Sequence, residues 1–123
     1  MSIIELHSRL AITAVLYAGV MALWALLRYI RKGKIDSNYW GAAVIIEVLI
    51  LLQGTIGIYL YISGKGFLVR SFMHILYGIV AVLVIPGVFL FTKGSEERRV
   101  AGIYVVAFIF LVGILIRSMS TGG

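Results

Sequence analysis

The chain has no cysteine and is short of charge, with 16 Lys, Arg, Asp and Glu residues, two histidines and one proline among 123 residues. Without cysteine, disulfides, thiolate metal ligands and thiol redox chemistry are excluded. Hydrophobic residues make up 62% of the chain and the mean hydropathy is +1.09. Because apolar usage in a soluble domain is closer to half, this composition indicates a membrane protein.

Long stretches without charge dominate the sequence. Leu10–Leu27, Ser71–Thr92 and Val100–Ile116 contain no Asp, Glu, Lys or Arg, and Tyr39–Ile62 contains Glu47 alone. About 20 helical residues cross the ~30 Å hydrocarbon core of a bilayer. The pattern predicts an all-α membrane protein, a four-helix transmembrane bundle forming one domain over residues 1–123. Short loops favour up-down topology, with helices at about 4–29, 39–62, 70–92 and 98–118.

The basic residues are unevenly distributed between the two ends of the predicted bundle. Seven lie around the first and third loops: Arg28, Arg31, Lys32, Lys34, Lys93, Arg98 and Arg99. Four lie at the other end: Arg9, Lys65, Arg70 and Arg117. The positive-inside rule places the first and third loops in the cytoplasm and both termini on the outer side, in the plasma membrane of a prokaryote. It also explains the net charge of +6 without a nucleic-acid partner.

The two histidines occupy matching positions. His7 and His74 each lie near the start of an odd-numbered helix, and odd helices run in the same direction, so both are expected at similar depth near the outer face. Helices one and three are diagonal in a four-helix bundle, so two imidazoles could meet there from opposite sides. Small residues follow each histidine at helical spacing: Ala11, Ala14 and Ala18, and Gly78 and Ala81. Such residues allow close packing or leave room for a flat ring.

This pattern favours a b-type haem whose iron is ligated by His7 and His74. A bis-histidine haem needs Cα atoms about 12–13 Å apart, and a compact diagonal supplies only about 9–10 Å. The bundle is therefore expected to splay near the outer face. The alternative is a hydrogen bond between helices. Zinc is less favoured, because no third ligand lies close to either histidine in sequence.

Further residues could contact such a cofactor. Glycines within helices would give a planar ring clearance: Gly54, Gly57 and Gly78. Arginines near the outer face could bind the two propionates, since the guanidinium group matches carboxylate geometry: Arg9, Arg70 and Arg117. The alternative role for these arginines is anchoring at the membrane surface.

Glu47 is the one acidic residue inside a charge-poor run. A carboxyl group within the bilayer is costly and is a functional candidate by default, here as a proton or quinone site on the inner side. The alternative is a protonated carboxyl bonded to a neighbouring helix. Glu47 shares a helical face with Gly54 and Tyr61, and this face is expected to point inward. Four aromatic residues are expected near the cytoplasmic interface, and an aromatic belt explains most of them: Trp24, Trp40, Tyr29 and Tyr39.

Three segments resemble, in the same order, motifs of the haem A synthase family. They are "LHSRLA" (Leu6–Ala11), "LLQGTIGIYLYISG" (Leu51–Gly64), with its Gln-Gly-x-x-Gly run, and "MHILYG" (Met73–Gly78). The resemblance extends to about Ala81 and implies one four-helix half of that eight-helix enzyme, with His7 and His74 as axial haem ligands.

The chain also departs from the family. The family places a glutamate three residues before its first histidine, whereas Glu5 is two residues before His7 and points elsewhere on a helix. The family has four haem-ligating histidines, and this chain has two. The favoured interpretation is a small membrane cytochrome b for one-electron transfer with a quinone or redox protein partner. The alternatives are a haem A synthase-like enzyme acting as a homo-oligomer and a cofactor-free accessory subunit of a larger complex.

Overall fold

The computed structural model describes the whole chain except residues 1, 34, 64–70, 94, 96 and 122–123. It contains four helices: α1 (Ile3–Ile30), α2 (Ser37–Ile62), α3 (Ser71–Thr92) and α4 (Arg98–Thr121). All four are long and apolar enough to cross a membrane. The protein is therefore an integral membrane protein, and the four predicted apolar helices are present.

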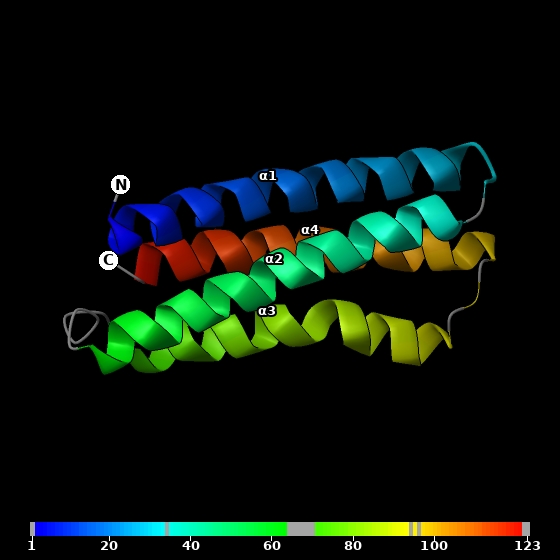
Figure 1. Ribbon diagram of the computed structural model, residues 1–123. Coiled ribbons are helices and arrows are strands. Elements are labelled where there is room, and N and C mark those ends of the chain that lie inside the picture. Colours follow the sequence, from blue (N-terminus) through cyan, green and yellow to red (C-terminus); the bar gives the residue numbers. More distant parts are fainter. Residues whose placement is uncertain (1, 34, 64–70, 94, 96, 122–123) are drawn as a thin grey trace.

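The helices form a four-membered bundle (Figure 1). Helix α1 packs against α2 and α4, and α3 packs against the same two helices. Helices α1 and α3 therefore occupy diagonal corners. Figure 1 shows both termini at the same end of the bundle, with the loops after α1 and α3 at the opposite end.

The packed core is concentrated away from the termini. Among the described residues, every buried apolar side chain except Leu60 lies in the middle of the bundle or toward the two loops. Tyr39 lies within this packed core and is fully buried. The centroid of its ring is 5.1 Å from that of Trp24 and 5.7 Å from that of Tyr104. Its hydroxyl donates to the Met21 carbonyl oxygen at 2.9 Å. Of the four aromatic residues expected near the interface, Tyr39 is therefore buried in the core and does not face lipid, because this hydrogen bond lets its polar end be buried.

The end with the termini is more open. Figure 1 shows α1 and α2 close together beside the loop that joins them and further apart at the other end. His7, Gln53, Gly57 and His74 lie toward this more open end and are all only half-buried. The helices therefore diverge in the part of the bundle where the sequence predicted a splay.

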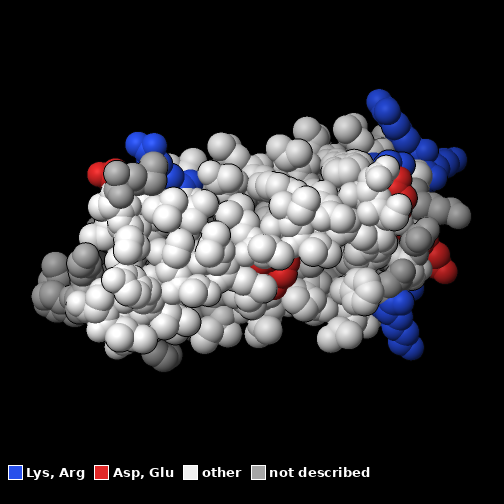
Figure 2. Space-filling view, viewed as in Figure 1, with Lys and Arg blue, Asp and Glu red and all other residues white. Residues whose placement is uncertain are grey.

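Charged groups lie mainly at the two ends of the molecule (Figure 2). At the loop end, Arg28 pairs with Asp36 at 3.0 Å, and Asp36 also caps α2 by accepting the Tyr39 amide N–H at 3.1 Å. Arg98 lies over the Tyr29 ring, 4.3 Å from its centroid, and donates to the Tyr29 carbonyl oxygen at 2.9 Å. These contacts fix the loop end of the bundle while leaving the apolar surface between the ends to face lipid.

Candidate functional site: a histidine pair between diagonal helices

His7 of α1 and His74 of α3 meet across the bundle. Their ring centroids are 6.2 Å apart and the ring planes are inclined at 73°. The helices on which they lie are diagonal, so the side chains rather than the backbones close the distance. The two imidazoles, which the sequence suggested could meet between these helices, lie in a T-shaped contact.

The separation of the rings matches that of two ligands of one metal ion. An imidazole nitrogen lies about 2.0–2.1 Å from a bound metal and about 1.2 Å from its own ring centroid, so two imidazoles on opposite sides place their centroids about 6.4 Å apart. The observed 6.2 Å agrees within 0.2 Å. A direct hydrogen bond between the two imidazoles is not among the contacts of the described residues.

The protonation of His74 is set by its surroundings. Its Nδ1 lies 3.0 Å from the Ser118 carbonyl oxygen of α4, and 3.3 Å from the Ser118 hydroxyl. A carbonyl oxygen only accepts, so Nδ1 carries the proton and donates it. In the neutral ring Nε2 is then unprotonated, which is the form of histidine that binds a metal. Ser118 could not be identified from sequence, because a main-chain carbonyl has no residue signature.

His7 is held from the side of α2. A Cβ atom built on Gly57 would lie 3.4 Å from Cε1 of the His7 ring and 3.9 Å from Nε2. These are ordinary contact distances, so an alanine would just touch the ring and a larger side chain would displace it. Of the predicted glycines, Gly57 is thus the one that adjoins a histidine.

Gln53, one turn before Gly57, also reaches His7. Its Nε2 donates to the His7 carbonyl oxygen at 2.6 Å, which ties α2 to α1 at the level of the site. The Gln53 Oε1 atom and the His7 Nδ1 atom are both buried without a hydrogen-bond partner among the described residues. An amide within an apolar helix is a visible sequence signal.

The other predicted contacts lie differently. A Cβ on Gly54 or Gly78 would have no atom within 4 Å, and Gly54 is exposed. Arg9 is exposed on α1, two residues and about 200° around the helix from His7. Arg117 is exposed in the last turns of α4, next to Ser118. Arg70 lies outside the described residues.

Glu47 lies apart from the histidine pair. It precedes Gly57 by ten residues, about 15 Å along the axis of α2, and is half-buried, with Oε1 buried and without a hydrogen-bond partner in the described part of the chain. Tyr61, expected on the same inward face, is 52% exposed. The inward orientation of this face is wrong for Gly54 and Tyr61, because the stripe that meets the bundle runs through Ala43, Ile46 and Ile50 instead.

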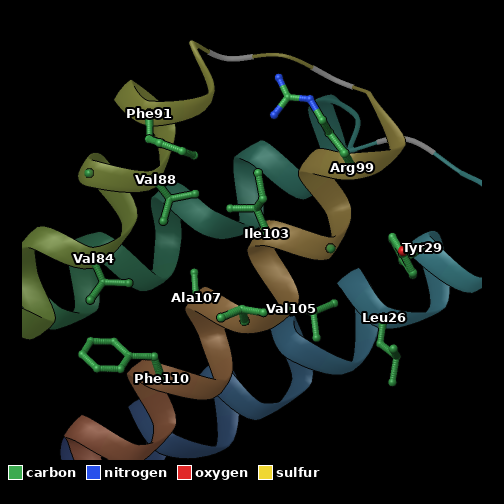
Figure 3. Close-up of a pocket in the computed structure, with 13 residues that line it drawn as sticks. Leu26, Tyr29, Val84, Val88, Phe91, Arg99, Ile103, Val105, Ala107 and Phe110 are labelled. Atoms are coloured by element: carbon green, nitrogen blue, oxygen red, sulfur yellow. The ribbon is translucent and has the colours of Figure 1, made fainter.

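A hollow on the surface of the bundle lies away from the histidine pair. An open groove of about 910 Å³ runs between α3 and α4, near the loop end, and is bordered by α1. Figure 3 shows Val84, Val88 and Phe91 of α3 facing Ile103 and Phe110 of α4 across it. Its lining is almost wholly apolar, so it has the character of a lipid-facing surface. It contains neither histidine.

Among the described residues, no group of three or more His, Cys, Asp or Glu side chains could hold a metal ion. A site built on the two histidines needs its remaining ligands from the cofactor itself. Comparison of the chain with protein-family models, with curated proteins and with solved structures found no match.

Proposed function

We propose that this protein is a membrane cytochrome of b type, in which His7 and His74 hold one haem for one-electron transfer. The observation that carries the proposal is the 6.2 Å separation of the two ring centroids across the bundle diagonal. Two imidazoles on opposite sides of one iron atom would have about this spacing.

The residues present fit this group in two further respects. His74 donates its Nδ1–H to a main-chain carbonyl, which leaves Nε2 available as the ligand. A haem iron takes its four equatorial ligands from the porphyrin, so two protein ligands are sufficient, whereas a bare zinc ion with two histidines lacks a full ligand set. This difference favours haem over zinc.

The packing of the bundle is consistent with a cofactor at this end. The described core is dense around Tyr39 and Tyr104, and the residues around the histidines are only half-buried. A bundle that had to fill its own interior would also place large apolar side chains around the two histidines. Gly57 stands there instead, and its lack of a side chain leaves the His7 ring in place.

When bound, haem supplies a centre that alternates between ferric and ferrous iron and so transfers one electron at a time. The protein's contribution is to hold the two imidazoles at fixed separation. We place the site near the outer face of a prokaryotic plasma membrane, because the loop end of the bundle carries the larger number of basic residues. A quinone or a second redox protein would then exchange electrons from the outer side.

Electron transfer is preferred over oxidation of the porphyrin itself. An activity like that of the haem A synthases, which the sequence resembles, would require an acidic residue on the haem side of the first histidine. Glu5 is exposed, and its amide N–H binds the Ser2 hydroxyl at 3.1 Å at the start of α1. Two residues before His7, Glu5 is about 200° away around the helix.

The proposal is tested by spectra of the protein purified in detergent after expression with haem supply. Reduced-minus-oxidised difference spectra should show the α-band of a six-coordinate b haem in the wild type. His7→Ala and His74→Ala should each abolish that band, while Arg31→Ala, at the opposite end, should retain it. A colourless wild type would leave the accessory-subunit interpretation, and conversion of haem O by the purified protein would support the enzyme.

A further inference from the structure

We infer that Gln53 is the positioning residue of His7: its amide oxygen accepts the Nδ1–H of the imidazole and so leaves Nε2 as the metal-binding atom. The inference rests on the proposed function for its consequence at haem, and on contacts within the described chain for its geometry. Gln53 of α2 would then accept the Nδ1–H of His7, as the Ser118 carbonyl oxygen of α4 accepts the Nδ1–H of His74.

The contacts bring the two groups together. The amide nitrogen of Gln53 lies 2.6 Å from the carbonyl oxygen of His7, so its amide group is fixed beside that residue. The other end of the same amide, Oε1, and the Nδ1 atom of the same histidine are both buried, and neither has a hydrogen-bond partner among the residues that the structure describes. A buried polar atom without a partner costs about 1–3 kcal/mol. Small side-chain rotations that join these two atoms satisfy both at once.

The chemistry of the groups decides the direction of the bond. With its amide nitrogen committed to the His7 carbonyl, Gln53 presents only its oxygen to the ring, and an amide oxygen only accepts. The ring nitrogen facing it must then carry the proton. In a neutral imidazole the proton on Nδ1 leaves Nε2 bare. Gly57 lies one turn further along α2, where an added Cβ would be 3.4 Å from Cε1 and 3.9 Å from Nε2 of His7.

The two histidines then have matched partners from the two helices that flank them. Ser118 of α4 accepts from His74 at 3.0 Å, and Gln53 of α2 accepts from His7. Outer partners of this kind orient a ligating ring and raise its basicity, and their loss weakens metal binding by about 10- to 100-fold. A more basic ligand stabilises the ferric form and lowers the reduction potential.

The tautomer can be measured without haem. The measurement is ¹⁵N NMR of haem-free protein in detergent, labelled with ¹⁵N-histidine. The signals of His7 are assigned by their loss in His7→Gln. They should show a protonated Nδ1 and an unprotonated Nε2. Gln53→Leu should move the proton toward Nε2. Thr55→Val, which removes an exposed hydroxyl bonded to the Leu51 carbonyl on the same helix, should change nothing. An unchanged His7 tautomer in Gln53→Leu would overturn the inference, whatever the outcome with haem.

The loaded protein gives a second test. Gln53→Leu should bind haem about 10- to 100-fold more weakly than wild type and have a higher midpoint potential. Gln53→Glu keeps an acceptor for Nδ1–H, so it should retain haem and have a lower potential than wild type. A purely structural role through the His7 carbonyl would make Gln53→Glu resemble Gln53→Leu, because a carboxylate cannot donate. That result would refute the role of the amide oxygen, whereas a wild type that binds no haem would refute the proposed function alone.

Discussion

Replacing Gly57 by valine should eject the cofactor, and replacing Gly54 by valine should not. The two glycines are one turn apart on α2, and both belong to the Gln-Gly-x-x-Gly run. A Cβ on Gly57 would lie 3.4 Å from Cε1 of His7, already in contact, whereas a Cβ on Gly54 would meet nothing within 4 Å. The pair therefore separates contact with the histidine from the general effect of valine in this helix.

The magnitude follows from those distances. The two methyl groups of valine lie about 1.5 Å beyond Cβ, so at position 57 the His7 ring has to move by about 1 Å. Metal–ligand distances tolerate only about ±0.2 Å. Overpacking of this kind costs about 1–3 kcal/mol, which corresponds to a roughly 5- to 150-fold weaker affinity. Gly57→Ala, which only reaches contact, should stay within about threefold of wild type.

The assay is titration of haem into the purified, haem-free protein in detergent, followed by absorbance. The expected order of affinity is wild type and Gly54→Val alike, Gly57→Ala close behind and Gly57→Val far below. Equal affinities for the two valine variants would refute the argument, because they would show that the edge of His7 beside α2 plays no part in binding.

Three further predictions concern the rest of the molecule. Tyr39→Phe removes a buried hydroxyl that donates to Met21 and should lower the free energy of unfolding by about 1 kcal/mol, whereas Tyr104→Phe removes a buried hydroxyl that has no hydrogen-bond partner in the described part of the chain and should be near neutral in thermal melts; equal losses would contradict this. Glu47→Leu should raise the melting temperature, because Oε1 is buried and has no hydrogen-bond partner among the described residues, and should leave haem content unchanged; loss of haem would place Glu47 in the site. Arg28→Gln should cost less than about 1 kcal/mol, since its partner Asp36 is one-third exposed, and the difference should shrink in 1 M salt.

Sequence reasoning succeeded where a single physical constraint dominates. Charge-free runs such as Ser71–Thr92 have to lie in hydrocarbon, and a backbone in hydrocarbon has to be helical, so the four helices follow. The facing of His7 and His74 follows from equal depth and the diagonal placement of their helices. Both inferences need only the direction and order of the helices, which short loops largely fix.

It was less successful where the outcome depends on the rotation of one helix. Gly54 and Gly57 are equivalent in the motif, but a helix turns about 100° per residue, and only packing decides that Gly57 meets His7. The same rotation leaves Tyr61 exposed. Tyr39 was misplaced because its hydroxyl finds the Met21 carbonyl inside the core, a partner that no sequence pattern announces.

The central claim is that one iron atom is held between His7 and His74, and low-temperature electron paramagnetic resonance of the purified protein with one equivalent of ferric haem tests it most directly. The account predicts a low-spin ferric signal typical of two imidazole ligands, at one haem per chain, replaced by high-spin or unbound haem in both His7→Ala and His74→Ala. A wild type without the low-spin signal, or a signal that survives either substitution, would contradict it.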